Sequence, residues 1–453
     1  MLAKVGVNKT PSSLQGGTYQ VNTGSVIGKM GKFKVCFRDE QLTSHAGVAL
    51  VHELATRLGV EQIVDEELQV KQRERGYSEG QAIGALVHNL LLGGECLSDL
   101  EVLRGDPGTQ ELLAQEAILA PRTAREFLRK FDLGDIRDLQ RVNLRLQQRV
   151  RPQQPSATCT IDLDSSIYEQ ASARKQGSDQ AYNGEIGYHP LLAFWAEEGE
   201  LLFSHLRRGS AHTCRNVGWF LRETFKRVPA QAALALRADS GFYSKEVVQW
   251  CEAHSVRFSI TADQTAPLLA LMVAVPDRCW TALPDYPLCE VTELHYQPAR
   301  WRQAYRYVVK RQLTESKEGE LSWHYHVFVT NDEATPAPDL EGWHLQHADM
   351  ENRIKEHKSG LGLEKLPSGG FHANWASLLS GQIACNLLAW FKKLVLPSSY
   401  PHATLKTLRH HLLNLAGKIV HSARQCFLVL SNRYRYQAVW QFALGRLAHL
   451  QFS

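Results

Sequence analysis

Apolar residues in the first third of the chain recur every three or four positions. Over residues 42–153 this period predicts several short helices. The first ends at Gly59, a second begins at a Ser78–Gln81 capping box and ends at Gly93-Gly94, and a third begins with a similar box at Thr123. One face of the first helix is apolar and consists of Leu50, Val51, Leu54 and Leu58.

This pattern predicts a helical domain over residues 35–155. Basic side chains gather near one of its helices, and they are Arg122, Arg125, Arg129 and Lys130. Such a cluster suits a DNA-binding bundle, but a dimerisation bundle has the same helical pattern. The sequence leaves both interpretations open.

At residue 156 the pattern changes to short apolar strands that alternate with helices. The expected order is strand 158–165, strand 190–196, strand 200–207, helix 214–227, strand 232–239, helix 244–254 and strand 256–262. An order of β-β-β-α-β-α-β predicts a mixed α/β sheet.

The remaining segments flank or interrupt this α/β core. Strand-like residues between about 263 and 338 predict a separate β-rich insertion, after which the core, residues 156–370, resumes with a helix near 342–358. Residues 371–453 are predicted to be helical throughout, and residues 1–34, rich in Gly, Ser and Lys, to be a flexible basic arm.

Composition adds limits to this picture. The 453 residues are 44% hydrophobic and 22% charged, which suits a soluble protein of two or three domains. Neither a membrane span nor an export signal is indicated. The nine cysteines are scattered without a C-x-x-C pair, which argues against a disulfide framework or a zinc motif and fits a reducing cytoplasm. Folding could still bring a few together as ligands.

Charge is distributed unevenly. Residues 365–453 contain ten Lys or Arg and no acid, so the net charge of +4 leaves −6 for residues 1–364. A purely basic segment on an acidic body is typical of polyanion binding, with DNA or RNA as the usual partner. A solvated helical surface is the other interpretation.

Candidate chemistry begins with the first predicted strand. Asp162 and Asp164 share one face of that strand, while the apolar residues between them face the core. Acids in an apolar strand are unfavourable unless something compensates them, and a metal ion is the simplest compensation. Asp239 ends another strand, where ligands of α/β sheets gather. Taken singly, either acid is more simply interpreted as a strand-end cap or turn residue.

The helix near 342–358 carries a polar stripe. At about 100° per residue, four side chains fall within roughly 60° of one another, and they are His344, His347, Glu351 and Lys358. Apolar residues on the other side would pack on the sheet and bring Glu351 toward the aspartates. A solvated helix face is the alternative.

These motifs resemble the bacterial insertion-sequence transposases that have DDE catalytic domains. The family's first signature matches Ile161 to Ser166, its second matches Arg237 to Phe242, and its third, Tyr-x₂-Arg-x₃-Glu-x₆-Lys, keeps Glu351-x₆-Lys358. The stretches 184–190 and 370–374 are similar to the group named insertion sequence thirteen-eighty. The resemblance runs from about Phe33 to the end of the chain.

The resemblance implies an RNase H-like mixed-sheet catalytic core with a β-rich insertion, flanked by helical regions. Asp164, Asp239 and Glu351 would hold two Mg²⁺ or Mn²⁺ ions, with Asp162 as the substitute for Asp164. Lys358 would hold a phosphate of the DNA. The partners would be the terminal inverted repeats and target DNA, bound by a homodimer at the nucleoid in the bacterial cytoplasm.

Two positions depart from the family pattern, because His344 replaces its Tyr and His347 its Arg. His347 is expected to contact a phosphate or to pack beside the helix, and Arg353 and Lys355 to face DNA or solvent. Three functions follow from this: a transposase that cuts and joins DNA, an RNase H-like nuclease that only cuts, and a catalytically impaired DNA-binding protein derived from a transposase.

Overall fold

The computed structural model describes residues 26–30, 33–36, 41–73, 76–115, 117–154, 156–284, 286–315 and 319–452. The chain forms two compact units, residues 1–41 and residues 42–453. In the first unit, strand β1 (Val26–Met30) pairs antiparallel with β2 (Phe33–Cys36). That part of the predicted arm is therefore paired strand, as its β-branched and aromatic residues favour, and residues 1–25 lie outside the described residues.

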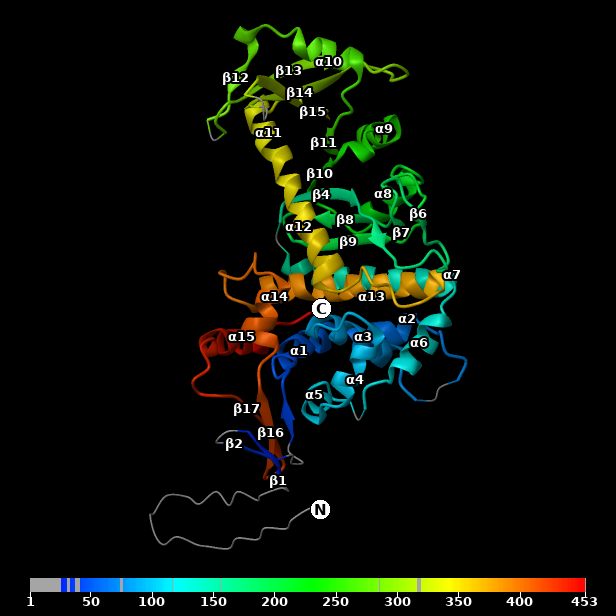
Figure 1. The fold of residues 1–453 in the computed structure, drawn as a ribbon, viewed down its shortest axis with the longest axis vertical. Coiled ribbons are helices and arrows are strands. Elements are labelled where there is room, and N and C mark those ends of the chain that lie inside the picture. Colours follow the sequence, from blue (N-terminus) through cyan, green and yellow to red (C-terminus); the bar gives the residue numbers. More distant parts are fainter. Residues whose placement is uncertain are drawn as a thin grey trace, which may run out of the picture. The chain divides into compact units, whose positions relative to one another are not determined.

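In the second unit, the N-terminal part is helical as predicted (Figure 1). Its α-helices are α1 (Val48–Leu58), α2 (Val60–Glu67), α3 (Glu79–Leu92), α4 (Leu100–Arg104), α5 (Pro107–Leu112), α6 (Pro121–Arg129) and α7 (Leu133–Val150). No helix in the described residues has the length and apolar character needed to cross a membrane.

Local sequence signals set most of the predicted helix ends. Gly59 and Gly93 terminate α1 and α3 in the left-handed conformation, which glycine adopts readily. Ser78 and Gln81 make both hydrogen bonds of the capping box. The box expected at Thr123 is wrong, because Pro121 starts α6 two residues earlier and its fixed φ suits the first helical position.

The predicted α/β core is a nine-stranded mixed sheet in the order β12-β13-β14-β15-β11-β10-β4-β8-β9. Strands β4, β10 and β11 are parallel, and every other pairing is antiparallel. The strands are β4 (Thr158–Ser165), β8 (Leu191–Trp195), β9 (Glu200–His205), β10 (Ala233–Ala238), β11 (Arg257–Thr261), β12 (Thr281–Ala282), β13 (Cys289–Tyr296), β14 (Tyr305–Glu315) and β15 (Leu321–Thr330).

The β-rich segment 263–338 is not separate from the core. Strand β15 pairs antiparallel with β11, with Ser259 opposite Thr330, so β12 to β15 extend the central sheet. The sequence shows strands but not their partners, because pairing between distant segments is a tertiary property.

Helices cover both faces of the sheet. One face packs against α8 (Val217–Phe225), α9 (Lys245–Ala253) and α10 (Ala266–Val273). On the other face lie α11 (Ala337–Leu345) and α12 (Asp349–Lys355), with Met350 and Ile354 packed on β8 and β9. Strands β5 (Tyr168–Glu169), β6 (Asp179–Gln180) and β7 (Ile186–Tyr188) form a small sheet beside the core.

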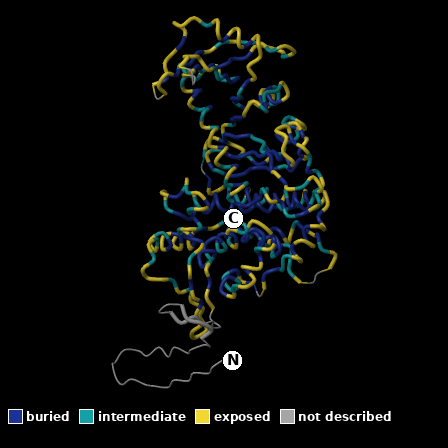
Figure 2. Tube along the Cα trace, viewed as in Figure 1, coloured by how far each residue is buried: buried dark blue, intermediate teal, exposed yellow. Residues whose placement is uncertain are grey.

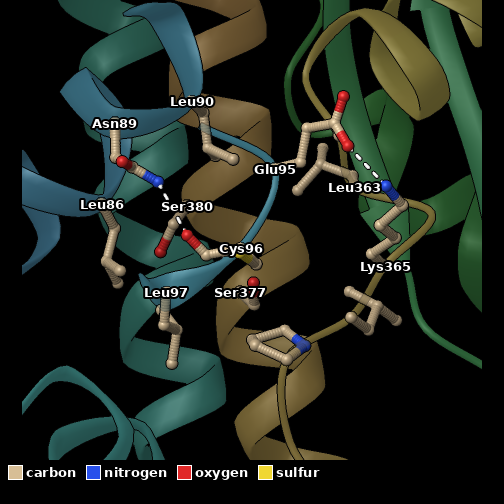
Figure 3. Close-up of a pocket in the computed structure, with 13 residues that line it drawn as sticks. Leu86, Asn89, Leu90, Glu95, Cys96, Leu97, Leu363, Lys365, Ser377 and Ser380 are labelled. Carbon is tan, nitrogen blue, oxygen red and sulfur yellow. Dashed lines mark hydrogen bonds and ion pairs between the residues drawn. The ribbon is translucent and has the colours of Figure 1, made fainter. Parts of the chain in front are cut away.

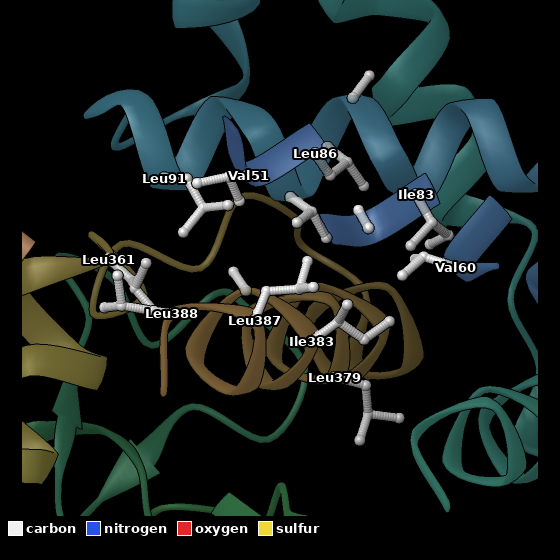
Figure 4. Packing of buried hydrophobic residues seen from close by; sticks show 14 of the residues in the cluster. Val51, Val60, Ile83, Leu86, Leu91, Leu361, Leu379, Ile383, Leu387 and Leu388 are labelled. Atoms are coloured by element: carbon white, nitrogen blue, oxygen red, sulfur yellow. The ribbon is translucent and has the colours of Figure 1, made fainter. Parts of the chain in front are cut away.

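The two helical flanks share one hydrophobic core. Helix α13 (Phe371–Trp390) contacts α3, α7 and β9, so it runs between the sheet and the N-terminal helices (Figure 1). It is buried along most of its length (Figure 2). Figure 4 shows Ile383 and Leu387 of α13 facing Ile83 and Leu86 of α3. The last helix, α15 (Gln437–His449), adds to the same core.

The expectation that residues 371–453 are all helical is wrong. After the short α14 (Leu405–Leu408), β16 (Gly417–Ser422) and β17 (Gln425–Val429) form a hairpin, and β16 also pairs with β3 (Leu42–Thr43). Both residues of its two-residue turn, Ala423 and Arg424, have positive φ, which matches the twist of a tight hairpin.

Leu387→Ala tests whether α13 holds the helical core. Because Leu387 is fully buried, we expect the substitution to lower the free energy of unfolding by about 2–5 kcal/mol. Leu444→Ala on α15 is the control, since Leu444 is 53% exposed and should change stability by less than about 0.5 kcal/mol. Urea unfolding followed by circular dichroism measures both, and equal stabilities would contradict this role of α13.

Candidate active site

Asp164 and Asp239 lie side by side at the carboxyl ends of two parallel strands. Leu163 on β4 is in register with Ala238 on β10, so the next residues of the two strands are these two aspartates. Neighbouring strands lie about 4.8 Å apart. The sequence predicts that each acid lies at the end of a strand. The parallel pairing of β4 with β10 brings the two acids next to each other.

Asp162 has a different environment from Asp164. Its side chain is fully buried, and the Arg237 guanidinium donates to both its oxygens, Nε at 2.8 Å and Nη2 at 3.0 Å. The same guanidinium donates to the Trp343 carbonyl oxygen of α11. Asp162 is therefore neutralised by a buried ion pair, whereas Asp164, two residues later on the same face, lines an open pocket.

The predicted helix over 342–358 is not one regular α-helix. Between α11 and α12, residues Gln346–Ala348 form a 3₁₀ turn, and after α12 residues Glu356–Gly360 form a π-helix. π-Helical turns are rare in proteins, and those that occur often lie at functional sites. Because the helix type changes along the segment, the rotation per residue is not a constant 100°. The side chains of the predicted stripe therefore do not all lie on one face.

The pocket of Asp164 lies between the end of β4 and this helical segment, and its volume is about 330 Å³. Its lining combines carboxylates, hydroxyls and two lysines, and consists of Asp164, Ser165, Ser166, Glu351, Ile354, Lys355, Lys358 and Ser359. Glu351 is exposed, and Met350 and Ile354 anchor its helix to the sheet. The structure thus brings Glu351, Lys355 and Lys358 to the pocket of Asp164.

Burial and the neighbouring carboxylates disfavour negative charge on the two aspartates of this site. Burial first, and then the nearby Asp239 and Glu351 carboxylates, raise the pKa of Asp164 from 3.8 to about 7. Burial also raises the pKa of Asp239, against the lowering effect of nearby His347. A divalent ion would offset this repulsion, and an oxygen-only donor set suits Mg²⁺ or Mn²⁺. The ligand atoms of the three acids do not all lie within 4.8 Å of one another.

Two histidines of the predicted stripe are held within the protein. His344 is buried, stacks on Phe328 and hydrogen-bonds Ser259 and Thr261 through its two ring nitrogens, so it does not reach the pocket. Burial holds its pKa well below the ordinary value. His347 is half-buried and donates from Nε2 to the Leu163 carbonyl oxygen at 3.1 Å. A phosphate contact by His347 stays a prediction.

Arg353, which was expected to face DNA or solvent, is half-buried and bonds within the protein. Its guanidinium donates to the carbonyl oxygens of Trp195 and Ala196 at the end of β8, and burial lowers its pKa. It fastens α12 to the sheet. Of the four side chains predicted to contact DNA, only Lys355 and Lys358 line the pocket.

The acid-free segment 365–453 offers fewer free charges than its composition suggests. Several of its basic side chains form hydrogen bonds within the protein, among them Lys365, Lys392, Lys393, Arg409 and Arg446. Arg424 and Arg433 are exposed. Polyanion binding by this segment stays a prediction.

Sequence reasoning missed two positioning groups. An arginine inside the apolar strand before Asp239 signals a buried partner, and this partner is Asp162. His189 Nε2 accepts a hydrogen bond from the Ser165 hydroxyl, 2.9 Å away, while its Nδ1 donates to the Ala211 carbonyl oxygen. No signal in the sequence pairs His189 with Ser165, because the contact depends on how β8 returns beside β4.

A smaller hollow lies elsewhere, between the end of α3 and the segment before α13 (Figure 3). It is lined mainly by apolar side chains such as Leu86 and Leu363, and the ion pair between Glu95 and Lys365 closes one side. Its volume is about 30 Å³, room for little more than a water molecule. The acidic pocket is the better candidate for chemistry.

The fold is a mixed α/β sheet with acids at the ends of its central parallel strands. This arrangement is typical of a class of proteins that carry out metal-assisted chemistry on phosphates. The sequence matches the family described as Transposase DDE domain group 1 over residues 27–452, and the chain belongs to this family. It is therefore a DDE transposase. No curated protein matches the chain.

Among solved structures, the chain is similar to one described as the cryo-EM structure of the piggyBac transposase synaptic complex with hairpin DNA. The two chains are 11% identical, the TM-score is 0.43, and the match covers 82% of this chain and 81% of the other.

The raised pKa of Asp164 predicts a pH-dependent stability in EDTA. The folded chain holds this proton more tightly than the unfolded chain, so the contribution of Asp164 to stability is greatest at low pH and is lost as pH rises from about 4 to about 7. The loss should be at most about 4 kcal/mol. It should shrink in Asp164→Asn and on adding Mg²⁺. Denaturant unfolding from pH 4 to 8 measures it, and identical slopes for wild type and variant would refute the assignment.

Proposed function

We propose that this transposase cleaves DNA at the ends of its element and joins them to target DNA, with Asp164, Asp239 and Glu351 holding one or two divalent ions. The observation that carries the proposal is the pairing of Asp164 with Asp239 on adjacent parallel strands, with Glu351 on the opposite wall of the pocket. Mg²⁺ or Mn²⁺ is the proposed ion, because every donor is a carboxylate oxygen.

The catalytic core is proposed to be RNase H-like. Strands β9, β8, β4, β10 and β11 support this, because three antiparallel strands are followed by two parallel ones in the order 3-2-1-4-5. Membership of the insertion sequence thirteen-eighty group is also a proposal, supported by the Glu351-x₆-Lys358 spacing.

The chemistry proposed is in-line displacement at phosphorus. A bound divalent ion would supply a water or 3′-hydroxyl nucleophile of lowered pKa and stabilise the leaving oxygen. Asp164 and Asp239 would fix the ion at the strand ends, since their backbones are held by the sheet. Because the Asp162 carboxylate is bound by Arg237, Asp162 is not proposed as a ligand.

The two pocket lysines are proposed to bind the DNA backbone. Lys355 and Lys358 line the same pocket as Asp164 and Glu351. Lys358 lies with its Nζ 5.8 Å from the centre of the Tyr168 ring, and the Tyr168 hydroxyl is hydrogen-bonded to buried His357. The position of Lys358 in the same lining as the acids favours a phosphate bound beside them.

The histidines at the two departures from the family pattern do not favour the impaired DNA-binding protein as the function. His344 and His347 are engaged in hydrogen bonds within the chain, and the three acids are all retained. A homodimer assembled on terminal repeats and target DNA, at the bacterial nucleoid, completes the proposal.

The first test replaces each acid by its amide. Asp164→Asn, Asp239→Asn and Glu351→Gln should each abolish cleavage while folding and DNA binding persist, because each amide keeps the shape of the side chain but removes a negative ligand. Asp349→Asn is the matched control, an exposed acid on the same helix that does not line the pocket.

Cleavage is measured on DNA that carries the terminal repeats flanking the coding region. Retained cleavage in Asp239→Asn would overturn the site assignment. Products that are cut but never joined would instead favour the nuclease function.

The second test concerns the lysines. Lys355→Gln and Lys358→Gln should each weaken DNA binding and reduce the slope of log K against log salt by about 0.9, the value for one lost phosphate contact. Lys226→Gln is the control, since Lys226 pairs with Glu223 outside the pocket and outside the basic segment. Binding is measured by fluorescence anisotropy over a range of salt concentrations. An equal change in the control would show a general charge effect.

A further inference from the structure

Three side chains of metal-ligating type converge outside the acidic pocket. They are Glu111 at the end of α5, His421 on β16 and Cys426 on β17, and their ligand atoms all lie within 4.8 Å of one another. In the described residues this is the one group of three or more such side chains with that spacing.

The hairpin register brings the histidine and the cysteine together. His421 and Cys426 are directly opposite each other in the β16–β17 ladder, where opposite side chains share a face. Ile419 is two residues before His421 and is buried, so this face points toward the protein. The tight turn at Ala423 and Arg424 therefore fixes two ligands that are separated by four intervening residues.

Glu111 supplies the third side chain from a helix that is tied to the same sheet. Its Oε1 atom contacts both other side chains. His421 Nε2 lies 2.9 Å from it, and the Cys426 thiol, which donates to it, lies 3.3 Å away. Helix α5 is held to β3 through Thr43, whose hydroxyl donates to the Asp106 carboxylate at its N-cap. Thr43 is also in register with Gly417 of β16. The three side chains are thus positioned by one framework.

The ligand atoms of this group suit a different metal ion from the one that suits the acidic pocket. A thiolate, an imidazole and a carboxylate together suit Zn²⁺ and related transition-metal ions, whereas Mg²⁺ requires oxygen ligands. Three protein ligands leave one position of a tetrahedral ion for water. His421 is 58% exposed, so an ion can reach the site from solvent.

We propose that Glu111, His421 and Cys426 form a second metal site, for Zn²⁺, which ties the β16–β17 hairpin to helix α5. On binding, the Cys426 thiol that donates to Glu111 loses its proton to solvent, and sulfur, Nε2 and a carboxylate oxygen become the ligands. The site is independent of the catalytic proposal, since it shares no residue with the acidic pocket.

Cobalt binding tests the proposal, because a thiolate–Co²⁺ bond gives a sulfur-to-metal charge-transfer absorption that carboxylate ligands do not. Full-length protein freed of metal should show this band, saturating at about one ion per chain with about one proton released. Zn²⁺ should displace Co²⁺, and Mg²⁺ should not. Zn²⁺ should also slow alkylation of Cys426 by roughly tenfold or more, because a bound thiolate is not free to react.

Variants separate the site from other thiols. Cys426→Ser should lose the band, and Cys96→Ser, at another exposed cysteine, should keep it. Glu111→Gln should weaken Co²⁺ binding by more than about tenfold and serves as the second variant should Cys426→Ser not fold by circular dichroism. Absence of the band in the wild type, its persistence in Cys426→Ser, or displacement by Mg²⁺ would each overturn the proposal and leave an ion pair between Glu111 and His421.

Discussion

The buried ion pair between Asp162 and Arg237 is the constraint on which the acidic site depends. It joins the central parallel strands β4 and β10 and connects them to α11 through the Trp343 carbonyl oxygen. Leaving either charge unpaired in the interior is costly, on the order of 3–5 kcal/mol. Because side chains alternate along a strand, fixing this pair also fixes Asp164 and Asp239 on the same face, two residues further along each strand.

Helix α13 links this sheet to the helical regions. Its buried residues pack on α3 and α7 on one side, and its Gln382 and Asn386 side chains donate to the Leu201 carbonyl oxygen of β9 on the other. The helices before and after the sheet in the chain are therefore one folded body with it.

The two proposed metal sites differ in the type of ligand atom that they offer. The acidic pocket offers oxygen atoms at strand ends, which suits hard ions that polarise phosphates. The proposed hairpin site offers sulfur and nitrogen as well, which suits zinc. A hard ion such as Mg²⁺, proposed for the acidic pocket, would not compete for the hairpin site, since hard ions bind thiolate poorly.

The sequence by itself determined the strands and helices of the core, their order, and the acids at two strand ends, because these depend on local periodicity and capping. It could not determine that Asp162 pairs with Arg237, that Arg353 fastens a helix to the sheet, or that His344 is buried, because each depends on a partner distant in the sequence. Strand pairing likewise joined segment 263–338 to the sheet and folded 417–429 as a hairpin. Only the tertiary structure decides such contacts, since they arise where distant segments meet.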